Sequence, residues 1–161
     1  MASHADTQQI REVAFETWTA AYRESLSIDF INNYLNKAFS ISKIRQLIDG
    51  DIVLGKSSFL VAEESNQIIG YAQLIQLSEA KYDLYRIYIK PGSQKQGIGT
   101  KFLSEFIKIM KSEDALTVTV KKDNVIGRAF YSKNGFKEVE ESTLTLEGKQ
   151  LAIIKYELII K

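Results

Sequence analysis

The sequence has no cysteine, one proline and one histidine, and each shortage excludes a class of site. Without cysteine the chain forms no disulfide, no thiolate metal site and no cysteine nucleophile. The single histidine, His4, lies beside the N-terminus in a segment that we expect to fray. A Ser-His-Asp triad or a multi-histidine metal site is therefore not expected, and we predict no metal.

An excess of charge of one sign is also absent, since 21 lysine and arginine residues face 20 aspartate and glutamate residues. No net field favours nucleic acid or an anionic membrane surface, so we expect neither partner. The first residues lack the basic and apolar regions of a secretory signal, and no apolar run reaches membrane-spanning length. We therefore predict a cytoplasmic protein that captures charged partners locally.

The 161 residues, of which 45% are hydrophobic, suffice for one core and leave little room for two domains. We predict a single domain over residues 1–161, because no repeat, low-complexity tract or linker interrupts the chain. The oligomeric state stays open, with a homodimer among the options.

Hydrophobic periodicity and turn residues predict a mixture of helices and strands. The predicted elements are a helix over residues 10–22, helices capped by Asp29 and Ser40, strands over 59–63, 68–77 and 82–90, a helix over 98–110, a strand over 116–120, a helix over 124–134, and strands over 136–142 and 151–160. Gly50 and Gly55 should bracket a break after the third helix. The tyrosine- and isoleucine-rich strand over 82–90 should be buried on both faces. This order predicts an α/β (α+β) fold with a mixed sheet covered by helices.

A glycine loop joins the strand over 82–90 to the helix that follows it, and its sequence runs from Gln94 to Thr100. At such a junction several backbone N–H groups converge, with the positive end of the helix dipole behind them. Gly97 and Gly99 remove side chains where the backbone must approach an anion, while Gln94 and Lys95 can add donors. The loop therefore has the shape and the charge to bind a pyrophosphate.

Other readings of the loop fit less well. A P-loop would need a lysine and a serine or threonine where the chain has Ile98 and Gly99. The third glycine of a dinucleotide-binding fingerprint would fall on Phe102, and the loop does not open a βαβ repeat. The remaining alternative is that two glycines simply allow a tight turn from strand to helix.

A second motif accompanies the loop further along the chain, and its residues are Asn124, Ala129, Phe130, Tyr131, Asn134, Gly135 and Phe136. The pair of motifs resembles motifs A and B of the GNAT acetyltransferases, and it is more specific than either motif alone. The order of elements from Phe59 onwards is similar to that family's fold. The resemblance implies a mixed, mostly antiparallel sheet of about six to seven strands with splayed central parallel strands, flanked by about four to five helices. Members of the family usually begin with a short strand, but the first helix of this chain begins so early that little room is left for one.

The resemblance also implies acetyl-CoA as cosubstrate and a set of residues that bind it. These residues are Ile87, Tyr88 and Ile89 on the strand, Gln94, Lys95, Gln96, Gly97, Ile98, Gly99 and Thr100 in the loop, and Asn124 and Tyr131 on the later helix. The backbone of Ile87 and Ile89 would pair with the pantetheine arm. The main pyrophosphate donors would be the amides of Gln96, Gly97, Gly99 and Thr100.

Acetyl transfer from a thioester to an amine needs a neutral amine, a stabilised oxyanion and an acid for the departing thiolate. By resemblance Tyr131 is the general acid, since a phenol's reference pKa of about 10 exceeds a thiol's of about 8.5. A backbone N–H near Tyr88 or Ile89 is the expected oxyanion donor. The alternative for Tyr131 is a helix tyrosine that only packs against the sheet.

The general base is less well defined, because many GNAT members place a glutamate on the central strand where this chain has Tyr85. Asp83 lies two residues earlier on the same strand face and could accept the amine proton directly or through water. The alternative is a solvated carboxylate near the strand end.

Three further features carry a narrower resemblance: the N-terminal helices, the segment from Tyr34 to Phe39, and the run from Arg86 to Lys90 that leads to the loop. With them the whole chain looks similar to the PaiA-like spermine and spermidine acetyltransferases of Gram-positive bacteria. We therefore predict an N-acetyltransferase that acts on a small-molecule primary amine such as a polyamine. Carboxylates available to pair with its ammonium groups are Glu63, Glu64, Glu79 and Asp83. Tyr85 argues instead for a less charged amine or a peptide N-terminus. The alternatives are another amine (amino acid, aminoglycoside, protein N-terminus), a non-catalytic CoA-binding module, or a nucleotide-binding α/β domain.

Overall fold

The structure, a computed structural model, describes residues 1–53 and 58–161. The chain divides into two compact units. The first comprises Met1–Gln73 and Arg86–Leu103, and the second comprises Leu74–Tyr85 and Ser104–Lys161.

The predicted succession of helices and strands is confirmed in the described residues. The helices are α1 (Thr7–Tyr22), α2 (Ile28–Ala38), α3 (Ile41–Val53), α4 (Ile98–Ile107) and α5 (Val125–Lys133), with the 3-10 turns η1 (His4–Asp6) and η2 (Pro91–Ser93). The strands are β1 (Phe59–Glu64), β2 (Gln67–Ser78), β3 (Lys81–Ile89), β4 (Ala115–Lys121), β5 (Lys137–Leu146) and β6 (Lys149–Ile159). Because β2, β3 and α4 cross the unit boundaries, each contributes residues to both units.

The strands follow the order β1-β2-β3-β4-β6-β5 and form a mixed sheet, as the predicted fold class requires. The pairs β1/β2, β4/β6 and β5/β6 are antiparallel, whereas β3 and β4 are parallel. The parallel ladder joins Lys81–Asp83 to Ala115–Thr117 only, although both strands continue beyond it. A parallel pair within an otherwise antiparallel sheet agrees with the fold that the resemblance implies.

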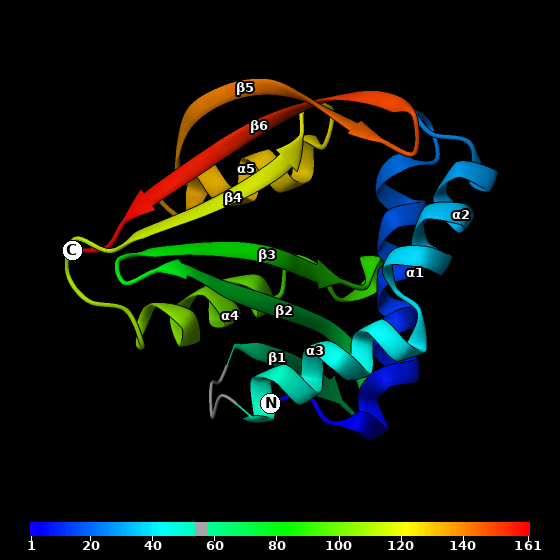
Figure 1. Ribbon diagram of the computed structural model, residues 1–161, viewed down its shortest axis with the longest axis horizontal. Coiled ribbons are helices and arrows are strands. Elements are labelled where there is room, and N and C mark those ends of the chain that lie inside the picture. Colours follow the sequence, from blue (N-terminus) through cyan, green and yellow to red (C-terminus); the bar gives the residue numbers. More distant parts are fainter. Residues whose placement is uncertain (54–57) are drawn as a thin grey trace. The chain divides into compact units, whose positions relative to one another are not determined.

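The helices α1, α2 and α3 lie together in the first unit (Figure 1). The apolar stripe predicted on α1 is its core face, since Ile10, Val13 and Ala14 are fully buried. Tyr71 of β2 is also fully buried in this unit, between the rings of Phe59 and Tyr88. The first unit therefore has an apolar core of its own.

The hairpin of β1 and β2 turns at Ser65 and Asn66, as predicted, with φ angles of 49° and 62°. Two successive positive φ angles are typical of a type I′ hairpin turn. Further along β2, a Cβ atom on Gly70 would lie 2.9 Å from the carbonyl oxygen of Tyr88. Glycine at this position therefore lets β2 pack closely against the end of β3, where the glycine loop begins.

In the second unit β4, β6 and β5 form a continuous antiparallel ladder, with a long hairpin of β5 and β6 (Figure 1). The predicted alternation of β4 is confirmed, because Leu116, Val118 and Val120 are buried. β5 ends the strand order, contacts α5 and exposes most of its residues. The core of this unit therefore lies under β4 and β6.

Two predicted helix boundaries are wrong. The cap of α2 is Ser27, whose Oγ accepts a hydrogen bond from the Phe30 amide at 3.2 Å, and Asp29 lies inside the first turn. Both residue types are good caps, so the sequence alone did not separate them. α3 continues through Gly50 to Val53, and Gly55 lies outside the described residues. The Ser40 cap is confirmed, since its Oγ accepts from the Lys43 amide at 3.4 Å.

The prediction that β3 is buried on both faces is also wrong. Tyr82 and Leu84 are buried, but Tyr85 is 52% exposed. The expected fraying near His4 is wrong as well, because the Ala2 amide donates to the Phe59 carbonyl at 2.9 Å and His4 Nε2 lies 2.7 Å from Asp49 Oδ1. In the described part of the chain no strand precedes α1. No described helix has the length and apolarity that crossing a membrane requires.

Candidate active site

The end of β3 is fixed to its surroundings through the carbonyl oxygen of Ile89. This oxygen accepts a hydrogen bond from Gln94 Nε2 at 3.1 Å and another from Thr17 Oγ1 at 3.4 Å. Next to it, Lys90 Nζ forms an ion pair with Glu16 Oε1 at 2.9 Å. Two residues of α1 and one residue of the loop thus hold the point where the strand becomes the loop.

The loop itself is shaped by hydrogen bonds of its own side chains. Gln94 Nε2 is bound to Ile89, and Gln96 Nε2 donates to the Gly92 carbonyl at 3.4 Å. Both glutamine amides therefore organise the loop, a role that the sequence did not reveal. The backbone at Lys95 and Gly97 has φ angles of 62° and 82°, in the left-handed region. Such reversals turn successive backbone amides towards one side, as anion-binding loops do.

The first turn of α4 supplies the remaining donors. The Gly97 carbonyl accepts from the Lys101 amide at 3.0 Å and so begins the helix. The amides of a first helical turn point out of the N-terminal end of the helix. The helix dipole places partial positive charge at the same point. Gly97 is exposed, and a Cβ built on it meets no atom within 4 Å. The loop residues therefore fit a pyrophosphate, which needs an open approach to the backbone.

The backbone of β3 presents alternate residues to β2. The Lys90 amide donates to the Ile69 carbonyl of β2 at 2.9 Å, so Lys90 and Tyr88 face β2 and Ile87 and Ile89 face away from it. The Tyr88 ring packs against the rings of Tyr71 and Phe39, with centroids 5.4 and 6.0 Å away. The outward-facing backbone groups at this strand end therefore belong to Ile87 and Ile89, and the Ile89 carbonyl is already occupied.

In the second unit, Tyr131 lies on α5 and is only 6% exposed. Its ring is surrounded by those of Phe130, Phe136 and Tyr156, with centroids at 5.3, 5.6 and 6.0 Å. The Tyr131 carbonyl accepts from the Phe136 amide at 3.1 Å, which ties the end of α5 to the start of β5. The Tyr131 ring therefore packs within the core, as the alternative prediction for this residue requires. This packing is compatible with a role of the hydroxyl group as general acid.

Asn124 is the N-cap of α5. Its Oδ1 accepts from the Gly127 amide at 2.9 Å, and a Cβ on Gly127 would lie 3.0 Å from Asn124 Nδ2. Asn124 and Tyr131 therefore share one short helix, and glycine at position 127 makes room for the cap. The capping role explains an asparagine here whether or not its side chain also contacts a ligand.

Asp83 is half-buried and hydrogen-bonded to the neighbouring strand. Thr117 Oγ1 donates to Asp83 Oδ1 at 2.8 Å and also lies 3.2 Å from the Tyr82 carbonyl. Burial raises the pKa of Asp83 above its ordinary value, while the Thr117 hydrogen bond and the charge of Lys155 lower it to a smaller extent. A carboxylate with a raised pKa is a better proton acceptor than an ordinary aspartate.

The residues predicted for the site belong to both units. Ile87, Tyr88, Ile89 and the loop from Gln94 to Thr100 are parts of the first unit, where the hydrogen bonds above bring them together. Asp83, Asn124 and Tyr131 are parts of the second unit. Over residues 1–53 and 58–161, no three His, Cys, Asp or Glu side chains gather to hold a metal ion.

The sequence pattern of the acetyltransferase (GNAT) domain matches residues 55–138. The spermidine N(1)-acetyltransferase of Thermoplasma acidophilum is 32% identical over 152 residues, which cover 89% of this chain and 91% of that protein. The PaiA N-acetyltransferase of Thermoplasma acidophilum, solved in complex with coenzyme A, superimposes with a TM-score of 0.81 at 28% identity, covering 98% and 95% of the two chains. A GCN5-related N-acetyltransferase structure from Rhodopseudomonas palustris, 15% identical, shares the fold with a TM-score of 0.74 over 98% and 92% of the chains.

We expect Gly97→Val to abolish coenzyme A binding, because a β-branched side chain disfavours the positive φ and projects where the anion approaches. Gly92→Val is the matched control, since a Cβ there also meets no atom within 4 Å and its φ is not positive. Calorimetric titration with coenzyme A measures both variants. Normal affinity in Gly97→Val would contradict the assignment of the loop.

Proposed function

This chain belongs to the GNAT acetyltransferase family, and from that premise we propose that it transfers the acetyl group of acetyl-CoA to a primary amine of a polyamine such as spermidine or spermine. The enzyme is an acyltransferase, and acetyl-CoA is its cosubstrate. The observation that carries the polyamine is the likeness, over nearly the whole chain, to a spermidine N(1)-acetyltransferase.

The proposed binding of the cosubstrate uses mainly backbone groups. The amides of Gln96, Gly97, Gly99 and Thr100 hold the pyrophosphate, assisted by the dipole of α4. The outward-facing backbone of β3 near Ile87 pairs with the pantetheine arm, which leaves the Ile89 amide for the reacting carbonyl group. Lys95, which is exposed, adds a positive charge beside the phosphates. The left-handed turn and the open surface at Gly97 support this proposal.

In the proposed reaction the substrate amine attacks the thioester carbonyl directly, forming the C–N bond as the C–S bond breaks. Asp83 accepts the proton that the amine loses, directly or through water. The Ile89 amide donates to the carbonyl oxygen as negative charge develops on it, because the Tyr88 amide faces β2. The Tyr131 hydroxyl group gives its proton to the departing sulfur. A primary amine is mostly protonated near neutral pH, so it must lose a proton before it attacks, whereas a phenol with the ordinary pKa of about 10 keeps its proton there.

A second candidate substrate is a less charged amine, such as an amino acid, an aminoglycoside or a protein N-terminus. It is favoured by Tyr85, which is 52% exposed at the position where many family members have a glutamate. Of the carboxylates predicted to line a polyamine site, Glu63 and Glu64 are exposed in the first unit and Glu79 is exposed in the second. We also predict that residues 1–161 act as one domain, that the protein is cytoplasmic, and that a homodimer is among its possible states.

An assay of thiol release from acetyl-CoA tests the proposed function. Spermidine and spermine are expected to give a higher kcat/KM than amino acids, an aminoglycoside or a short peptide. A higher kcat/KM with one of the other amines would favour the second candidate. No thiol release with any amine, despite calorimetric binding of coenzyme A, would indicate a non-catalytic CoA-binding module.

Tyr131→Phe is expected to lower kcat about ten- to a hundredfold, the low end of general-acid contributions, with little change in affinity for coenzyme A. The variant keeps the ring that packs among Phe130, Phe136 and Tyr156. Tyr82→Phe removes another buried phenol of the second unit and should leave kcat unchanged. Equal kcat in Tyr131→Phe and the parent enzyme would exclude the proposed general acid.

The raised pKa of Asp83 predicts the acidic limb of the pH profile. Since the base must be deprotonated, kcat/KM should rise with pH through a pKa above the ordinary aspartate value. Thr117→Val removes the hydrogen bond that lowers this pKa and should move the limb to higher pH. Thr119→Val, at an exposed position of the same strand, is the control. A limb that persists unchanged in Asp83→Asn would assign the base to another group.

A further inference from the structure

We propose that Tyr156, held by Arg128 and Glu138, is a positioning residue that orients the ring of Tyr131 for proton donation. This inference rests on the proposed role of Tyr131 as general acid. The three residues come from β6, α5 and β5, so they join three elements of the second unit.

The ring of Tyr156 is one wall of the space that Tyr131 occupies. The two ring centroids are 6.0 Å apart with an angle of 36° between the planes, and Tyr156 is only 3% exposed. Phe130 and Phe136 form the other aromatic contacts, yet neither carries a polar group that could fix its own orientation. Tyr156 is therefore the neighbour through which a polar network can set the angle of the Tyr131 ring.

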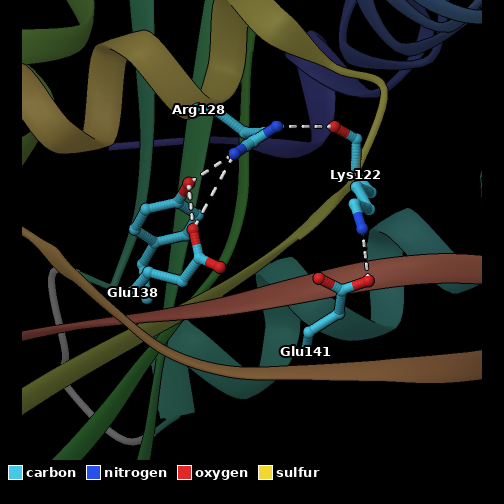
Figure 2. A network of polar contacts seen from close by, with 5 residues as sticks. Lys122, Arg128, Glu138 and Glu141 are labelled. Carbon is cyan, nitrogen blue, oxygen red and sulfur yellow. Dashed lines mark hydrogen bonds and ion pairs between the residues drawn. The ribbon is translucent and has the colours of Figure 1, made fainter.

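That network is centred on the Tyr156 hydroxyl group. Arg128 Nε donates to the Tyr156 oxygen at 3.2 Å, and the same hydroxyl group donates to Glu138 Oε2 at 3.4 Å. A guanidinium nitrogen of Arg128 also lies 3.8 Å from Glu138 Oε2 (Figure 2). The phenol thus lies between an arginine and a glutamate, and it bonds to one on each side.

Arg128 and Glu138, with their hydrogen bonds to the Tyr156 hydroxyl group, form what we call the clamp on Tyr156. Arg128 links this clamp to α5, the helix that carries the proposed acid. It lies three residues before Tyr131 on α5, so the two side chains leave neighbouring positions on the helix surface. Nη1 of Arg128 donates to the Lys122 carbonyl at 3.2 Å, which fixes Arg128 to the turn before the helix (Figure 2). Because a helix rotation would move Tyr131 and Arg128 together, the clamp on Tyr156 opposes that rotation.

The Tyr131 ring must be held in a fixed position, because a proton donor misplaced by about 1 Å can lose much of its effect. α5 has nine residues, and its first turn exposes Val125 and Ile126, so little of this helix is held by burial alone. The alternative is that the network only stabilises the fold. The neighbouring ion pair of Lys122 and Glu141, in which another carboxylate of β5 is paired with a lysine, provides the comparison (Figure 2).

The test compares Tyr156→Phe and Glu138→Gln with the matched control Glu141→Gln, which also neutralises a carboxylate of β5. Tyr156→Phe keeps the ring and removes only the clamped hydroxyl group. We expect both network variants to lower kcat about three- to tenfold with unchanged KM for acetyl-CoA, and the control to match the parent enzyme. Thermal unfolding of each variant shows whether it folds. If Tyr156→Phe does not fold, Glu138→Gln carries the test alone.

The double variant Tyr131→Phe/Tyr156→Phe separates positioning from stability. If Tyr156 acts through the Tyr131 hydroxyl group, the double variant should have the kcat of Tyr131→Phe alone. The inference would be overturned if the double variant lowered kcat by the product of the two single factors, or if Tyr156→Phe alone kept the kcat of the parent enzyme. Either result would leave the proposed function intact. If Tyr131→Phe itself keeps full kcat, the proposed acid fails and the inference fails with it.

Discussion

The carbonyl oxygen of Ile89 sets the point at which the central strand gives way to the binding loop. It accepts from Gln94 ahead and from Thr17 of α1, and the Lys90–Glu16 ion pair supports the same junction. All of these bonds join groups of the protein itself, so the fold fixes the direction of the loop amides. Such preorganisation reduces the cost of ordering on binding and lets backbone dipoles act at full strength.

The parts of the molecule that sequence predicted well are those whose signals are local. α4, β4 and α5 follow from the spacing of apolar residues, and the glycine loop follows from residues adjacent in the chain. The turn at Ser65 and Asn66 is equally local, since both residue types tolerate or favour its backbone angles. Family membership could be recognised for the same reason, because the paired motifs are short, continuous segments.

The features that sequence did not predict depend on residues far apart in the chain. The half-buried state of Asp83 comes from Thr117 on the parallel strand, and the clamp on Tyr156 comes from α5 and β5. Nothing in the neighbouring residues of any of these side chains indicates its partner. The exposure of Tyr85 does not follow from the composition of β3, because the packing around each strand position decides its burial.

The outermost strand of the sheet also bears on how copies of the chain behave in concentrated solution. A ten-residue edge such as β5 leaves a row of backbone groups on which another polypeptide could add a strand. Three exposed glutamates, Glu138, Glu140 and Glu141, line this edge, and the register shifts beside Val139. Like charges and an irregular backbone both oppose pairing with an identical edge. The carboxylates of β5 therefore disfavour pairing of this edge with the same edge of a second copy.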